Sequence, residues 1–498
     1  MGDDFPDFDY DYGAENGGHG RFRNGCFVLL SLFLVVVLLA AFVPTVLWLF
    51  SFQNDRPPAE PTPTPGLLGE APAEPAEPAA TPPLAEAVVN AETVAETPTS
   101  PPPPALELDV NRIAYINEDG QLMTVASDGG DARQLTRGRQ RLRFPAWSPD
   151  GRQIAAIGTT GSAVAVYAVD AEAKRSQPVA LYADRDKTPF YLYWSPDSAQ
   201  ISFLSSNTAG LALQLVPADG AEESRIVATG SPFYWNWTAD GRQMLIHAGE
   251  SSQDARLELI ETNGDGRGDP IANPGRFQAP VISADGRYWA YAEQTQGNSQ
   301  IVIEDKETGA KQVQRHAGLT ALGWSPAADI LAFISGDSPE SDDFEGPLRL
   351  MDAATGEITL LSREKVLAFF WSPDGRYLAA FNFRGRLQNR GDISARAKGE
   401  FAKPARQFDL PSMELTIFDV TTGEGRVILE FTPTLTFLSQ FLPFFDQYAL
   451  SHRLWSPQSD ALTLPVQEGN VSQIIYISAK TGSTRTLGEG DMPFWSQN

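Results

Sequence analysis

The chain has 498 residues, enough for two to four ordinary domains or one large array of repeats. Its 38 Lys and Arg residues against 63 Asp and Glu residues give a net charge of −25, and a surface of that sign disfavours nucleic acid as a partner. Cys26 is the single cysteine, which excludes an intramolecular disulfide.

An acidic tail is followed by a long apolar run. Residues 1–25 hold six carboxylates and two arginines, and residues 26–52 (CFVLLSLFLVVVLLAAFVPTVLWLFSF) carry no charge. About 20 apolar residues suffice for a helix to cross a membrane, whereas a secretory signal has an apolar region of only about 7–15 residues. We therefore expect one transmembrane helix over 26–52, and a buried core helix is the alternative.

The flanking charges predict how this helix is oriented. Arg21 and Arg23 precede the run and Arg56 follows it. The positive-inside rule then places the tail in the cytoplasm and the rest of the chain outside the plasma membrane.

Residues 53–109 are predicted to form a linker. Residues 57–104 contain 15 of the 38 prolines, interleaved with Ala, Glu and Thr, and such a composition cannot bury a core. Proline-rich chain prefers an extended conformation of about 3.1 Å per residue. We expect a stalk that holds the following module away from the membrane, with a disordered tether on the inner side as the alternative.

From residue 110 one phrase recurs, as in AWSPDGRQIAAIG (146–158) and FWSPDGRYLAAFN (370–382). Its tryptophan position is occupied by Trp147, Trp194, Trp237, Ile282, Trp324, Trp371, Trp455 and Trp495. The gaps are 47, 43, 45, 42, 47, 84 and 40 residues. A period in the forties made only of short strands is typical of a β-propeller.

The phrase has a structural reason. Proline presets φ for the first central position of a tight turn, and glycine takes the positive φ that closes the turn. The alternating residues that follow predict a strand. The tryptophan is expected to pack between neighbouring sheets.

The two ends of the array complement each other. Residues 110–120 (VNRIAYINEDG) have the second half of the phrase, and residues 492–498 (MPFWSQN) have only the first half. We therefore expect the C-terminal strand to join the first three strands and close the ring, which hides sheet edges. Eight four-stranded blades over 110–498 are predicted if the 84-residue gap holds one blade with insertions; seven or nine are the alternatives.

These WSPDG repeats resemble those of the TolB-type propeller family, a WD-like repeat family. The resemblance covers most of 110–498 and implies a bacterial envelope protein whose ring serves as a platform for binding proteins. Two departures stand out. The small α/β domain that precedes the ring in that family is replaced here by the predicted anchor and stalk, and the family's ring usually has six blades and is soluble.

The chain offers little catalytic chemistry. His247, His316 and His452 lie in different repeats, at spacings that do not suit a shared metal, and no G-x-S-x-G motif occurs. Residues 261–270 (ETNGDGRGDP) echo a calcium loop, but Ala272 stands where a bidentate glutamate is needed. We expect no metal and no cofactor.

Two segments of the seventh repeat suggest a binding site. Residues 383–408 are basic within a domain of net charge −12, and residues 431–455 are rich in aromatic side chains. The hypothesis is one site on the rim of the ring for an anionic or protein ligand, and the alternative is that these residues pair and pack within the ring. The candidate residues are Arg384, Arg386, Arg390, Arg396, Phe441, Phe444, Phe445, Tyr448 and His452.

We therefore expect a monomeric, non-enzymatic scaffold that binds an envelope protein or an anionic ligand outside the membrane. One alternative is a propeller-type enzyme of the envelope, such as a lyase or a lactonase, that uses the central channel. Another is a sensor that signals through the 25-residue tail, whose length leaves no room for a signalling domain.

Overall fold

A computed structural model describes residues 111–497, apart from 174–176, 209, 251–253, 265, 296–297, 337, 339–344 and 385–409. Within this part of the chain, no helix is long and apolar enough to cross a membrane. The tail, the apolar run and the proline-rich stalk predicted for residues 1–109 lie outside the described residues, so those predictions stay untested.

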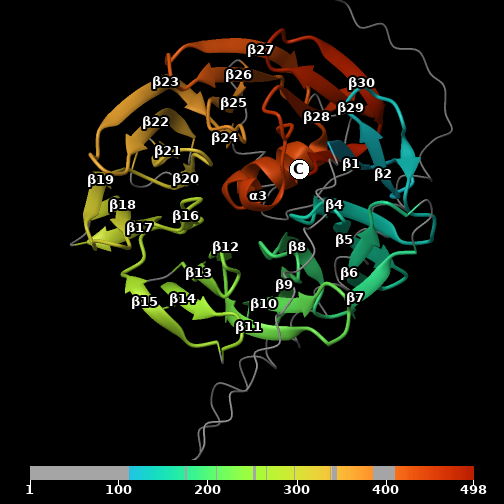
Figure 1. Ribbon diagram of the computed structural model, residues 1–498, viewed down its shortest axis with the longest axis horizontal. Coiled ribbons are helices and arrows are strands. Elements are labelled where there is room, and N and C mark those ends of the chain that lie inside the picture. The colour runs from blue at the N-terminus through green and yellow to red at the C-terminus, as the bar shows by residue number, and fades with distance from the viewer. Residues whose placement is uncertain are drawn as a thin grey trace, which may run out of the picture. The chain divides into compact units, whose positions relative to one another are not determined.

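Eight antiparallel sheets surround a common centre, as an eight-bladed propeller requires (Figure 1). The first sheet joins both ends of the ring and contains β31 (Asp491–Trp495), β1 (Arg112–Ile116), β2 (Leu122–Ala126) and β3 (Arg133–Gln134). Ile113 pairs with Trp495 and Ala114 with Phe494. The predicted closure by the C-terminal strand is confirmed.

Each of the next six sheets takes four consecutive strands. The second and third contain β4 (Arg141–Trp147), β5 (Gln153–Thr160), β6 (Ala163–Asp170), β7 (Val179–Asp184), β8 (Pro189–Trp194), β9 (Gln200–Asn207), β10 (Gly210–Pro217) and β11 (Arg225–Gly230). The fourth and fifth contain β12 (Phe233–Trp237), β13 (Gln243–Ala248), β14 (Arg256–Glu261), β15 (Gly268–Ala272), β16 (Val281–Ile282), β17 (Tyr288–Thr295), β18 (Asn298–Asp305) and β19 (Lys311–Arg315).

The last three sheets include the long 84-residue interval. The sixth and seventh contain β20 (Thr320–Trp324), β21 (Ile330–Ser335), β22 (Gly346–Asp352), β23 (Ile358–Val366), β24 (Ala368–Trp371), β25 (Tyr377–Phe383), β26 (Met413–Asp419) and β27 (Gly425–Phe431). The eighth contains β28 (Ala461–Glu468), β29 (Val471–Ser478) and β30 (Thr484–Glu489). The interval therefore holds one blade, and eight blades are confirmed.

The recurrent turn has the predicted geometry. In the second blade, the N–H of Gly151 donates to the carbonyl of Ser148, and Gly151 has a φ of 71°. Two repeats carry serine instead of glycine, and Ser198 and Ser459 each adopt a φ of 61°. Each of these two hydroxyls accepts an N–H from the turn of the preceding blade, at 3.1 Å and 3.0 Å. A hydrogen bond between blades thus offsets backbone strain that glycine would avoid.

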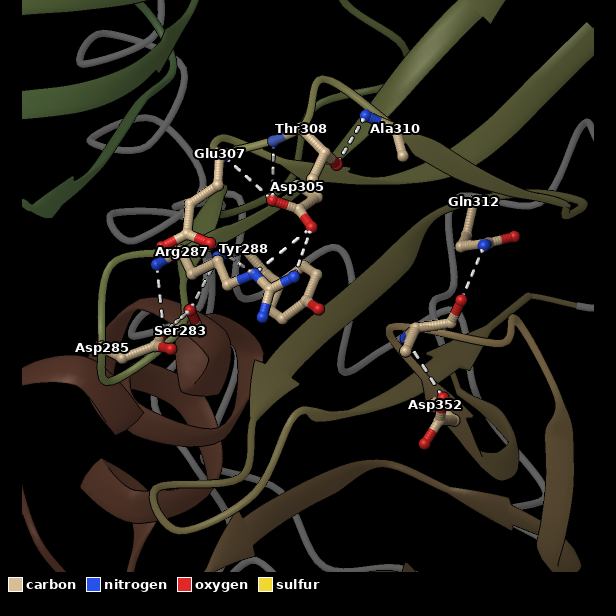
Figure 2. Close-up of polar contacts among 11 residues, drawn as sticks. Ser283, Asp285, Arg287, Tyr288, Asp305, Glu307, Thr308, Ala310, Gln312 and Asp352 are labelled. Carbon is tan, nitrogen blue, oxygen red and sulfur yellow. Dashed lines mark hydrogen bonds and ion pairs between the residues drawn. The ribbon is translucent and has the colours of Figure 1, made fainter.

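A second polar network joins the turns of one blade, as Figure 2 shows for the fifth. The Ser283 hydroxyl donates to the Asp285 carboxylate at 2.6 Å. The Arg287 guanidinium binds Asp305 at 2.7 Å and holds the pKa of that carboxyl well below its usual range (Figure 2). The Gln312 amide reaches the Ala354 carbonyl in the next blade at 3.1 Å.

The tryptophans link neighbouring blades in a regular way. Each linking indole N–H donates to the carbonyl of the residue that precedes the tryptophan position in the blade before it. Five such bonds of 2.9–3.2 Å join Trp147 to Phe494, Trp194 to Ala146, Trp324 to Val281, Trp371 to Gly323 and Trp455 to Phe370. The predicted packing of tryptophan between sheets is therefore confirmed, with a directional bond added to it.

Three junctions differ. Trp237 donates to the Ser202 hydroxyl at 3.1 Å, and that hydroxyl donates to the Tyr193 carbonyl at 2.7 Å, so a serine relays the link. Ile282 has no donor to offer. Among the described residues, the buried indole N–H of Trp495 has no hydrogen-bond partner.

The indole bond can be measured by comparing two tryptophans. Trp194→Phe should lower the free energy of unfolding by about 1–2 kcal/mol more than Trp495→Phe. Both changes remove a similar volume from a buried site, but only Trp194 loses a hydrogen bond. Equal losses in urea denaturation would show that the ring is held by indole packing alone.

Candidate functional site in the centre of the ring

The innermost strand of the eighth blade is split by an insert, residues 435–452. Pro433 pairs with Val466, and Trp455 pairs with Leu462, both across from β28. Between these two bridges β28 advances by four residues, whereas the chain facing it advances by 22, so the facing chain contains 18 extra residues. They form η1 (Phe437–Phe441), η2 (Leu442–Phe444) and α3 (Phe445–Ser451), and α3 lies at the centre of the ring (Figure 1).

Two consecutive polar residues dock α3 on the inner edges of two blades. The Gln447 amide accepts the N–H of Trp235 and donates to the carbonyl of the same residue, both at 2.9 Å. Gln447 therefore pairs with β12 as a neighbouring strand would. The Asp446 carboxylate accepts the N–H of Ala279 at 3.2 Å, just before β16. Tyr191 adds a bond from its hydroxyl to the Gln447 carbonyl at 2.9 Å.

The aromatic candidates form the apolar side of the insert. Phe441, Phe445 and Tyr448 are 1–5% exposed, and His452 is 2% exposed. Phe441 stacks on Phe370 of the seventh blade with ring centroids 5.8 Å apart. These four side chains therefore pack within the ring, which is the alternative to the predicted binding site.

Phe444 differs from the other aromatic candidates, because it is 45% exposed. Leu435, in the same insert, is 62% exposed. These two are the large apolar side chains that the insert presents to solvent.

The basic candidates lie largely outside the described residues. Arg386, Arg390 and Arg396 all belong to the segment 385–409. Arg384 is described, and its guanidinium forms an ion pair with the Glu430 carboxylate of β27. For this one arginine, pairing with a carboxylate of the ring itself is observed.

The histidines do not share a site. Burial lowers the pKa of His247 to about 4 and that of His452 to about 3, so both imidazoles are neutral at pH 7. Burial also lowers the pKa of His316, with a further contribution from the charge of Arg276. No group of three metal-ligating side chains occurs among the residues that the structure describes.

A central pocket of about 190 Å³ lies between α3 and the sixth, seventh and eighth blades. The described residues that line it include the polar side chains of Asp446, His452 and Arg453, and aromatic and proline residues make up half of the lining. Burial raises the pKa of Asp446 to about 6. The sequence analysis did not single out Asp446, Gln447 or Arg453. The signal was present, because an adjacent acid and amide interrupt an otherwise aromatic run.

Comparison with known proteins agrees with this architecture. Residues 110–337 match the family model of the TolB beta propeller domain. No curated protein sequence matches the chain.

Several solved structures resemble the chain at low identity. TolB from Acinetobacter baumannii is 19% identical over 50% of this chain and 65% of that one, just under two thirds of its length, with a TM-score of 0.33. A putative TolB from Agrobacterium tumefaciens is 20% identical over 53% and 94%, with a TM-score of 0.32. An oligogalacturonate lyase from Vibrio parahaemolyticus is 12% identical over 76% and 84%, with a TM-score of 0.39.

The buried carboxyl of Asp446 should make stability depend on pH. Its folded-state pKa of about 6 exceeds the ordinary value of 3.8, so its contribution is full below pH 4 and is lost as the pH rises through 6. Relative to Asp446→Asn, the wild type should lose about 2 kcal/mol of unfolding free energy between pH 4 and pH 7.

The control for this measurement is Asp285→Asn. The Ser283 hydroxyl lowers the pKa of Asp285, so here the wild type should lose relative stability as the pH falls below 4. A difference between wild type and Asp446→Asn that does not change with pH would contradict the burial of an ionisable carboxyl at this position.

Proposed function

We propose that this chain, which carries a TolB beta propeller domain over residues 110–337, is a membrane-tethered scaffold that binds another protein of the cell envelope. The observation that carries the proposal is the insert in the ring centre. It fills the middle of the ring with aromatic side chains and leaves Leu435 and Phe444 exposed. Exposed apolar side chains on a rigid framework are typical of protein-binding surfaces.

The way the insert is held supports this role. Gln447, Asp446 and Tyr191 fix α3 through at least four hydrogen bonds to the ring. A partner would therefore meet side chains whose positions are set before binding, which reduces the entropic cost of association.

The place of action follows from the N-terminal sequence. We propose that residues 26–52 anchor the chain in the plasma membrane, with the tail in the cytoplasm, and that residues 53–109 carry the propeller outside the membrane. The support is the uncharged 27-residue run and the proline content of the linker.

The proposal assigns no catalytic role to the ring. An enzyme that worked in the centre would have to use the pocket of about 190 Å³ beside α3, where Asp446, His452 and Arg453 are polar side chains of the lining. Release of a product from oligosaccharides incubated with the purified propeller would favour the lyase alternative and count against a pure scaffold.

Anchoring can be tested by fractionation. The full chain should be recovered with the membrane fraction, and a chain that lacks residues 1–52 should be soluble. Protease added to intact cells or spheroplasts should digest the propeller. A propeller protected in intact spheroplasts but digested after lysis would reverse the proposed orientation.

Partner binding can be tested by cross-linking the tagged full-length protein in cells and identifying the captured proteins. The double variant Leu435→Ser, Phe444→Ser should reduce capture of an envelope partner at least tenfold, because it removes the exposed apolar groups of the insert. The matched control Val179→Ser, Val427→Ser removes two groups that are 56% and 53% exposed on outer strands and should leave capture unchanged. Equal capture by both variants would contradict the proposed surface.

A further inference from the structure

A second pocket lies between the fifth and sixth blades, away from the insert. Its volume is about 320 Å³, and the described residues that line it come from the end of β19 and the following loop, and from β21 and β22 with their connecting ends. Volumes of about 300 Å³ and above are typical of small-molecule sites. The function proposed above makes no use of this pocket.

The charged side chains of the lining are basic, whereas the protein as a whole is acidic. Arg315, His316 and Arg349 line the pocket, and none of the described residues that line it is acidic. The chain as a whole carries a net charge of −25. A local cluster of cationic groups in such a protein attracts anions selectively to one place.

Within the described part of the chain, neither Arg315 nor Arg349 has a carboxylate within ion-pair distance. Arg349 lies over the Phe333 ring with its guanidinium carbon 5.9 Å from the ring centroid. Other arginines of the ring do pair, as Arg287 does with Asp305 at 2.7 Å.

His316 adds a neutral donor. Both of its ring nitrogens are buried and have no hydrogen-bond partner, although its backbone N–H donates to the Ser299 carbonyl at 3.2 Å. A polar side chain that is left without a partner inside a pocket is costly unless water or a ligand completes it. The imidazole can offer one N–H beside the two guanidinium groups.

We propose that this pocket binds a small molecule through an oxyanion group, a carboxylate or a phosphate. Planar guanidinium groups match both kinds of oxyanion through paired N–H donors. Arg315 and Arg349 supply the charge, and His316 supplies a neutral donor. This site is independent of the protein-binding surface on the insert.

The test is calorimetric titration of the purified full chain in detergent, first with inorganic phosphate and separately with succinate. The wild type should bind at least one of the two, and the more tightly bound probe identifies the oxyanion. Arg315→Gln and Arg349→Gln should each weaken binding at least tenfold. Arg139→Gln, which removes the same charge from an exposed position between the first and second blades, should leave binding unchanged.

Three results would overturn the proposal. One is the absence of binding of both probes by the wild type at millimolar concentration. Another is equal affinity in the wild type and in the Arg349→Gln variant, with circular dichroism showing that the variant is folded. The third is binding that arises only when Asp342 and Asp343 are changed to Asn, which would assign the two arginines to the chain's own acidic segment.

Discussion

A tryptophan indole that donates to the backbone of the preceding blade is the interaction on which the ring depends. Five junctions use it directly, and Ser202 relays it at a sixth. Donor and acceptor always belong to different blades, so no isolated repeat can form the bond or bury its tryptophan. Each blade therefore gains its stability from its neighbours, as expected of repeat architectures.

The two junctions without an indole link are joined by other means. Between the eighth and first blades, the backbone N–H of Trp495 donates to the Arg453 carbonyl at 2.9 Å, and the chain runs from β30 of the eighth blade directly into β31 of the first. Between the fourth and fifth blades, where Ile282 replaces tryptophan, Gln447 binds Trp235 of one blade and Asp446 binds Ala279 at the start of the other. The insert is thus part of the ring's closure as well as a surface that solvent reaches.

This double role bears on function. A segment that bridges two blades and fills the centre cannot move freely, so its exposed side chains are presented in fixed positions. The oxyanion pocket between the fifth and sixth blades is built differently, from strand ends and the loop that joins two blades. The two proposed binding sites therefore lie at separate places on one ring, as the repeated architecture allows without any change of fold.

The sequence alone predicted the propeller and its closure by the C-terminal strand, because the WSPDG turn and the following strand are local and recur along the chain. It favoured eight blades but left seven or nine open, and the structure decided for eight by showing one blade in the 84-residue interval. It also identified the aromatic segment of the seventh repeat, but it could not show whether those side chains lie on the surface or in the core. The burial of Phe441, Phe445 and Tyr448 was decided by tertiary structure, because these side chains are enclosed only once the blades surround the insert. Tertiary structure also decided the contacts of Gln447 and Asp446 and placed Arg315 and Arg349 in one pocket. Their neighbours belong to other blades or to the insert, and only the packing of these elements against one another brings them into contact.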